Sequence, residues 1–326
     1  MNRIAVILSV LALVCGCSWL NEPDAPAGQE YGKGNVYFVF SFEGALSTKA
    51  SDVHGDSTIN TAQVAVFDGN RQIGYGCASI DDVRGEVVVR DLPLGKTLGC
   101  YVVANVAESV MGMTKSEIEA MEVALSSYRT TSIPMFARGE KSFSGSDNSL
   151  SLQLRRAASK IVIESVKADF VSDKVAGQDC ILKGVYLGSA PGRCRVSLGE
   201  PAGQVYYHAG GFSADDETAL GEAAPLVART DIGADLKGRG SYDEVIGLYC
   251  CPTSSDVTSV VFWMQIGDSD YHFSYKFDSL EPNKMYLIRS ALVKGADVPD
   301  PVTEQEVLVD IEVAEWVLGD SVEVPY

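Results

Sequence analysis

The sequence predicts an all-β protein with two domains and a single short helix. Most of its 326 residues form short apolar segments separated by Gly, Asp, Asn and Ser, a pattern typical of strands joined by turns. Helical periodicity stands out in one segment only. Once an export signal is removed, about 310 residues remain, which is enough for two domains of roughly 150 residues each.

The first residues have the pattern of an export signal. Arg3 precedes an apolar run at 4–14, and polar residues follow too soon for a membrane-spanning helix. The run ends in Val14-Cys15-Gly16-Cys17, which resembles the lipobox of bacterial lipoproteins. That resemblance implies cleavage after residue 16 and acylation of Cys17, for example by palmitate, so that lipid anchors the protein in the outer membrane. The alternative is an ordinary signal peptide that is cut nearby.

Composition excludes some partners and leaves the disulfides open. The formal net charge of −18 argues against nucleic-acid binding and against adsorption to an anionic membrane. Six cysteines follow Cys17, and an exported protein can oxidise them. They allow fifteen connectivities. Pairing of Cys77 with Cys100, and of Cys180 with Cys194, is plausible because each pair is close in sequence. Cys250 and Cys251 are adjacent, so on a strand they point to opposite faces.

The segment NVYFVFSFEG at 35–44 predicts the first strand. Four of its large apolar residues share one face: Val36, Phe38, Phe40 and Phe42. Tyr37 and Val39 make the start of the other face apolar too, and a strand that is apolar on both faces is usually buried on both sides. The polar stretch 45–58 has no periodicity and is typical of an exposed loop.

One helix is predicted near residue 114. Thr114 and Glu117 form a capping box, in which each side chain can bond to the other residue's backbone N–H. Ile118, Met121 and Leu125 then fall on one apolar stripe of a helix. We expect these three residues to belong to the core, with the helix packed across the end of a sheet.

The second half of the chain repeats the β pattern and ends in a regular alternation. The hairpin at 257–277 has one predicted core face: Tyr271, Phe273, Tyr275 and Phe277. Near the C-terminus four β-branched residues occupy alternate positions: Val307, Val309, Ile311 and Val313. Such a strand completes the sheet of its own domain or adds itself to another sheet.

No pattern of catalytic, metal-ligating or cofactor-binding residues emerges from the sequence. The three histidines, His54, His208 and His272, have no matching Cys or carboxylate cluster beside them. Metalloprotease, nucleophile-elbow and phosphate-loop motifs are absent. We therefore expect a protein that is not an enzyme and that needs no cofactor or metal.

Several segments, in order, resemble the fimbrillins, the lipoprotein-derived subunits of the type V fimbriae of Bacteroidia. Besides the lipobox, the matching segments are AQVAVFDGNRQIG (62–74), YVVANVAES (101–109), SIPMFARGE (132–140), LRRAASKIVI (154–163), LEPNKMYLIRSALVKG (280–295), DVPDPV (297–302) and VLVDIEVAEWVLGDSVEV (307–324). Each motif is weak alone, whereas their order and spacing are specific. Trp316 stands in the position usual for the family's ending.

The resemblance implies two tandem transthyretin-like β-sandwich domains. It places a signal peptide at 1–16, a lipidated segment with a removable first strand at 17–49, an N-terminal sandwich at 50–152 and a C-terminal sandwich at 153–326. It also implies that a trypsin-like protease cuts after the first strand at the cell surface. That strand then leaves, and the C-terminal strand of another fimbrial subunit fills its place.

The resemblance and the sequence differ at the expected cleavage site. The best-known fimbrillins are cut after an arginine, yet no arginine lies between Cys17 and Arg71. Lys49 lies in the polar loop, so we expect cleavage between Lys49 and Ala50. Arg71 is a poorer site because it sits in a tight turn. Without the cut, the subunit would be an anchor or a cap.

A second function is compatible with the same β-rich sequence. A surface lipoprotein could bind glycans through a β-sandwich and remain monomeric. That function needs aromatic residues exposed on a flat face. Trp263 and Trp316 instead occupy positions typical of structural residues. Glycan binding by a monomer would favour this alternative.

Overall fold

The computed structural model describes residues 32–42, 56, 58–170, 178–199, 205–213, 226–237, 239–255, 257–295 and 305–316. The predicted signal peptide at 1–16, the lipidation site Cys17 and the predicted cleavage site at Lys49 and Ala50 lie outside these residues. No helix among the described residues has the length and apolar character needed to cross a membrane.

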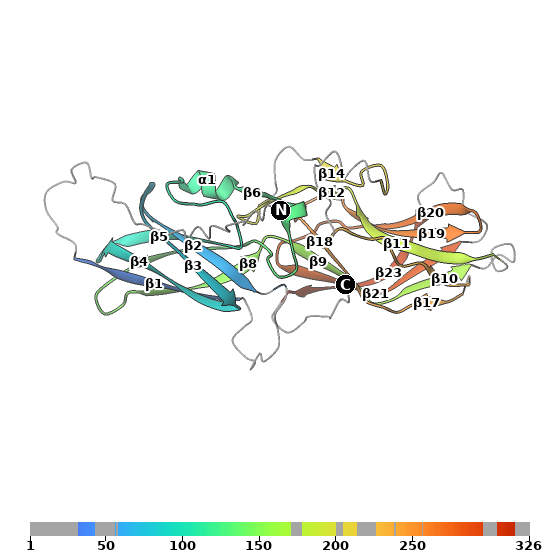
Figure 1. Cartoon of the computed structure of the whole chain (residues 1–326), viewed down its shortest axis with the longest axis horizontal. Helices are drawn as coiled ribbons and strands as arrows, with labels where there is room; N and C mark the ends of the chain where they lie inside the picture. Colours follow the sequence, from blue (N-terminus) through green and yellow to red (C-terminus); the bar gives the residue numbers. More distant parts are fainter. Residues whose placement is uncertain are drawn as a thin grey trace, which may run out of the picture. The chain divides into compact units, whose positions relative to one another are not determined.

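The first domain is a β-sandwich made from one folded-over sheet (Figure 1). Its strands follow the order β3-β2-β5-β7-β8-β1-β4. Their bounds are β1 (Lys33–Phe42), β2 (Ile59–Asp68), β3 (Arg71–Asp82), β4 (Arg84–Pro93), β5 (Thr97–Ala104), β7 (Met135–Ser142) and β8 (Ser149–Arg156). Apolar side chains from both halves of the sheet pack into one buried cluster that includes Phe38, Val64, Val87 and Val102. The two halves therefore face each other across a single core.

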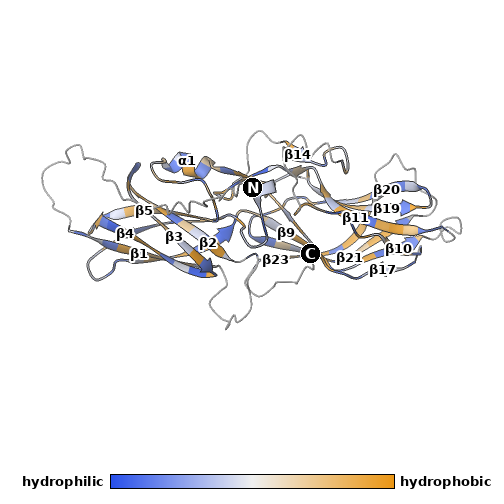
Figure 2. Cartoon of the chain, in the orientation of Figure 1, coloured by the Kyte–Doolittle hydropathy of each residue, from blue (hydrophilic) through white to orange (hydrophobic). Residues whose placement is uncertain are grey.

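The second domain is a sandwich of two sheets. One contains β18 (Ile246–Cys250), β9 (Ser159–Ile163), β21 (Lys284–Gly295), β10 (Val166–Phe170) and β17 (Ser241–Tyr242), with β23 (Leu308–Glu315) also paired to β21. The other contains β15 (Ala228–Arg229), β16 (Ala234–Asp235), β11 (Cys180–Gly188), β19 (Ser259–Ile266), β20 (Ser269–Lys276) and β22 (Gln305–Glu306). Both sheets contribute to one apolar core, and β11 is largely hydrophobic in Figure 2.

The predicted fold class is confirmed: the described chain is all-β, with two sandwich domains and a short helix in the first. The predicted core face of the hairpin is also confirmed for Tyr271, Phe273 and Phe277, which are buried. The predicted division between residues 152 and 153 lies inside β8. The domain bounds themselves stay a prediction.

The helix begins where the sequence predicts and ends earlier. α1 spans Lys115–Ala120, and the Thr114–Glu117 capping box is formed in both directions. Met121 already has an extended backbone, and the short strand β6 (Glu122–Ala124) follows. Leu125 opens a 3₁₀ turn and packs into the core of the second domain, whereas Ile118 and Met121 pack beside α1. The prediction of one stripe containing all three residues is therefore wrong, although all three are buried.

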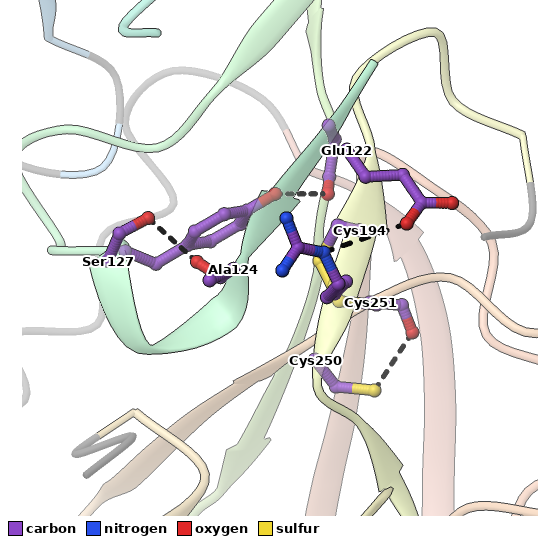
Figure 3. The surroundings of a disulfide bond; sticks show 9 residues. Glu122, Ala124, Ser127, Cys194, Cys250 and Cys251 are labelled. Atoms are coloured by element: carbon purple, nitrogen blue, oxygen red, sulfur yellow. Dashed lines mark hydrogen bonds and ion pairs between the residues drawn. A yellow bond between two sulfur atoms is a disulfide. The ribbon is translucent and has the colours of Figure 1, made fainter. Parts of the chain in front are cut away.

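Both disulfide pairs favoured from the sequence are wrong. The disulfide joins Cys194 to Cys251 (Figure 3), with their Cα atoms 5.1 Å apart, so Cys194 is not bonded to Cys180. Cys77 on β3 and Cys100 on β5 lie on opposite sides of β2. Two strand spacings amount to about 9–10 Å, beyond the Cα separation of roughly 7 Å that a disulfide can span.

The Cys194–Cys251 disulfide connects the segment that contains β13 to the core of the second domain. Cys194 lies in β13 (Arg193–Arg195), which pairs with β6 of the first domain. Cys251 follows β18, and the neighbouring Cys250 thiol points to the Cys251 carbonyl oxygen (Figure 3). Two adjacent buried cysteines thus differ in their bonding, because Cys251 forms the disulfide and Cys250 does not.

Candidate functional site

The predicted removable strand, β1, lies in the interior of its sheet. It pairs antiparallel with β4, from Lys33 opposite Pro93 to Ser41 opposite Arg84. On its other side it pairs parallel with β8, from Tyr37 opposite Ser149 to Phe42 opposite Leu154. An interior strand uses the hydrogen-bonding groups of both its edges. β1 is therefore the bridge between β4 and β8.

Only one face of β1 is buried. Val36, Phe38 and Phe40 have no exposed surface, and Phe38 packs edge-on against Phe143 with ring centroids 6.0 Å apart. On the other face Val39 is 38% exposed. The prediction that both faces are buried is therefore wrong, because no layer formed by the described residues covers the outer face at Val39. The side chain of Phe42 lies outside the described residues.

The core is shaped around the inner face of β1. Gly85 of β4 lies opposite Phe40. A Cβ atom at Gly85 would lie 2.7 Å from the Phe40 ring and 2.4 Å from Ile80. Removal of β1 would thus leave a slot with an apolar floor, edged by the unpaired backbone groups of β4 and β8.

The predicted donor strand, β23, is held far less completely. Among the described residues it pairs with β21 alone, from Leu308 opposite Leu292 to Glu315 opposite Lys284. Two ion pairs join the same strands, between Lys284 and Glu315 and between Arg289 and Glu312. Within the described part of the chain, β23 is therefore an edge strand.

The apolar face predicted for β23 is interrupted at Val313. Val307, just before the strand, is buried, and Val309 and Ile311 are half-buried against the core. Val313 is 55% exposed, as is Leu308. Val313 does not lie on the buried side of β23, because the protein-facing side passes to Ala314 and Trp316 at the strand's end. The role of these residues in a donor strand stays a prediction.

Trp316, which directly follows β23, lies in a buried cluster that we call the Asp56 junction. Its members are Asp56, Arg156, Lys160, Tyr249, Asn283 and Trp316. The Trp316 indole N–H donates to Asp56 Oδ2 over 3.2 Å, and Lys160 Nζ donates to the same oxygen over 2.7 Å. Arg156 donates to the backbone carbonyl oxygens of Asp56 and Trp316, over 2.9 and 2.6 Å.

The junction contains charges that depend on one another. Arg156 and Lys160 are buried, and both face the carboxylate of Asp56. Burial by itself raises the pKa of Asp56, but Lys160 and Arg156 outweigh it and keep that pKa below its ordinary value. Burial lowers the pKa of Arg156 to about 9 against the attraction of Asp56. Asp56 and Arg156 are therefore both charged at neutral pH.

Sequence reasoning found the strands but missed this junction. The LRRAASKIVI and PNK segments stand out as motifs in the sequence. The pattern of 45–58 predicts an exposed loop, whereas Asp56 is only 8% exposed. One signal was available: Arg156 and Lys160 lie in or beside apolar strands, and buried cations need a carboxylate. The sequence did not indicate which of 44 acidic residues supplies it.

Trp263, the other tryptophan among the described residues, does not offer a ring face to which a sugar could bind. Trp263 on β19 is half-buried and stacks on Phe212, with ring centroids 5.5 Å apart, and on His272 at 6.2 Å. Trp316 is 1% exposed. Neither ring is free to lie flat against a sugar.

No protein-family model matches this sequence. No curated protein matches it either. Solved structures, however, have a similar fold. A candidate cell adhesion protein from Parabacteroides distasonis is 15% identical, with a TM-score of 0.60, over 88% of this chain and 98% of that one. Another from Bacteroides eggerthii is 18% identical, with a TM-score of 0.58, over 89% and 98%.

A fimbrilin from Porphyromonas gingivalis is also similar. It is 15% identical, with a TM-score of 0.59, over 87% of this chain and 98% of that one. These similarities extend over nearly the whole of each solved chain. The resemblance to fimbrillins inferred from the sequence motifs is thereby confirmed at the level of the fold.

Proposed function

We propose that this chain is a structural, non-catalytic subunit of a cell-surface fimbria that polymerises by donor-strand exchange and supports adhesion. The observation that carries the proposal is the interior position of β1 between β4 and β8. The likeness of fold to a fimbrilin and to candidate cell adhesion proteins supports it.

The physical basis is the free energy that a replacement strand would recover. Val36, Phe38 and Phe40 are fully buried, and burial of such side chains is worth about 1.5–3 kcal/mol each. An empty slot would also leave two rows of backbone groups without partners. A second strand of alternating apolar residues would restore both contributions by β-augmentation.

β23 is the candidate for that strand in a neighbouring subunit. Val309 and Ile311 already lie on one face, and an extended strand would add Val307 and Val313 to it. In the described subunit Leu308 and Val313 are exposed, and one edge of β23 forms no described pairing. The cost of leaving its own domain is correspondingly lower than for an interior strand.

Processing completes the proposal. Acylation of Cys17 would anchor the exported chain to the outer membrane until a trypsin-like protease cuts between Lys49 and Ala50. The lipid would then leave with β1. The partners are thus other fimbrial subunits, the protease and, before the cut, the membrane.

The test is the N-terminal sequence and intact mass of the protein from native cell surfaces. A start at Ala50 in SDS-resistant ladders is the expected result. A start at acylated Cys17 in monomers only would contradict polymerisation, and glycan binding by those monomers would favour the glycan-binding alternative.

The processing site is tested by Lys49→Gln. We expect this variant to retain β1 and to remain monomeric, because the protease loses its basic residue. Lys33→Gln is the matched control, since Lys33 is the other basic residue between Cys17 and Arg71. Normal assembly of the Lys49→Gln variant would refute cleavage at this bond.

A further inference from the structure

The attachment of β23 to its own domain is uneven. Along most of its length, side chains are exposed or half-buried, and Leu308 and Val313 are each 55% exposed. At its end Trp316 is 1% exposed and is among the largest fully buried side chains of the described residues. Release of the strand therefore requires extraction of Trp316 above all.

The backbone N–H, the carbonyl oxygen, the ring and the indole N–H of Trp316 each have a partner. Its backbone N–H donates to the Asn283 carbonyl oxygen over 3.1 Å, and its own carbonyl oxygen accepts from Arg156 over 2.6 Å. The Arg156 guanidinium lies 4.2 Å from the centre of the indole ring, at cation–π distance. The indole N–H finds its acceptor in Asp56.

Asp56 comes from the opposite end of the chain. It lies six residues after Ala50 and three before β2 begins at Ile59. It thus belongs to the stretch that joins the predicted cleavage site to the first domain. A residue close to the predicted cleavage site and the residue that directly follows the candidate donor strand therefore share one hydrogen bond, across 260 positions.

The two residues stabilise each other's position. Without the Asp56 carboxylate, Trp316 loses the acceptor for its indole N–H, and Arg156 and Lys160 lose the negative charge they both face. Without Trp316, these charged groups lose the ring that covers them. Loss of a partner by a buried polar or charged group costs free energy of folding. Coupling of this kind is reciprocal: whatever loosens one residue loosens the other by the same factor.

We propose that Asp56 couples the two ends of the chain, so that loosening of the N-terminal segment releases Trp316 and with it strand β23. The inference rests on the proposed function for its biological meaning. Cleavage between Lys49 and Ala50 would remove the covalent connection on one side of Asp56 and leave a new charged amine six residues away. One cut would then both free the slot of β1 and loosen the strand to be donated.

The uncut chain could accordingly neither accept a strand nor donate one. β1 fills the acceptor slot, and the Asp56 junction holds the donor strand. Premature assembly would be prevented without any second signal. A subunit would become able to accept and to donate at the same time, which a growing polymer of identical units requires.

The test is hydrogen–deuterium exchange, resolved by peptide, on the purified monomeric chain before and after a cut at Lys49. We expect β23 (308–315) to exchange about 10-fold faster or more in the cut chain and in Asp56→Asn, as expected for loss of one hydrogen bond to a charged group. β11 should be unchanged in both. Asp68→Asn is the matched control, because Asp68 ends β2 in a part-exposed ion pair with Lys96.

Trp316→Phe provides a second test that leaves the charges in place. It removes the indole N–H and keeps an aromatic ring, so β23 should again exchange faster. Reciprocity adds a readout that a purely structural role would not give: protease should cut the Lys49–Ala50 bond faster in Trp316→Phe than in the parent chain.

Unchanged exchange of β23 in both variants would overturn the inference. Equal acceleration in β23 and β11 would also overturn it, because that result means a general loss of stability. The proposed function fails separately. A chain that polymerises without this coupling refutes only the inference, and a coupled chain that never polymerises refutes only the proposed function.

Discussion

Strands β1 and β23 both contain apolar residues at alternate positions and lie toward opposite ends of the chain. They differ in how completely they are paired and buried. β1 is paired on both edges, and its three described inward side chains are fully buried. β23 is paired on one described edge, and its side chains are exposed or half-buried until Trp316. The difference lies in surroundings more than in composition.

Under the proposed function, this contrast would allow a subunit to be stable before assembly and reactive afterwards. A strand with two paired edges is held by backbone pairing along its whole length. It can dissociate only after its covalent connection to the domain is cut. A strand with one paired edge has a backbone partner on one side only, and Trp316 after it is the most completely buried side chain of that segment.

Phe38→Ala should have the largest effect. Phe38 is fully buried and contacts Phe143, so its removal should destabilise the fold by about 3–5 kcal/mol. Val39→Ala, on the exposed face of the same strand, should change the free energy of unfolding by less than about 0.5 kcal/mol. Denaturant unfolding measures both. Equal effects would contradict the one-sided burial of β1.

Trp316→Ala should produce the same contrast within the C-terminal segment. Loss of this buried ring should cost about 3–5 kcal/mol, because the Asp56 junction loses both its cover and a donor. Val313→Ala should cost less than about 0.5 kcal/mol, since that side chain is 55% exposed. Thermal unfolding of the monomer measures both variants. A larger effect of Val313→Ala than of Trp316→Ala would refute the conclusion that Trp316 holds the C-terminal segment in place.

Acid should weaken the junction through Asp56. The folded-state pKa of Asp56 lies below its ordinary value of 3.8, so its ionised form stabilises the fold at higher pH. That contribution is fully present above the unfolded pKa and is lost as the pH falls through the folded pKa. The difference in stability between the parent chain and Asp56→Asn should therefore shrink below about pH 4. A difference that stays constant down to pH 2.5 would contradict the ionised state of Asp56.

Salt should have the smallest effect. The Lys284–Glu315 and Arg289–Glu312 pairs join β21 to β23 near the surface, where ions in solution screen them. Hydrogen exchange of β23 should rise slightly between low and high salt, and Glu312→Gln should remove part of that dependence. Exchange of β1 should not respond. A strong salt effect on β1 would contradict its retention by apolar burial.

Local patterns predicted the elements well because they depend on near neighbours. Alternation identified β1 and β23, and the capping box located the start of α1. The same reasoning failed wherever a distant segment decided the outcome. It treated the outer face of β1 as covered, and it extended α1 past Ala120, where β6 forms by pairing with β13.

The sequence by itself determined the all-β class, the faces that can be buried and the absence of a recognisable catalytic motif, because period and residue type act over a few positions. Only the tertiary structure decided that Cys194 bonds to Cys251, that Val313 faces solvent and that Asp56 meets Trp316. Those outcomes depend on strand order and register. Both are set by packing between segments far apart in the chain, which no local pattern records.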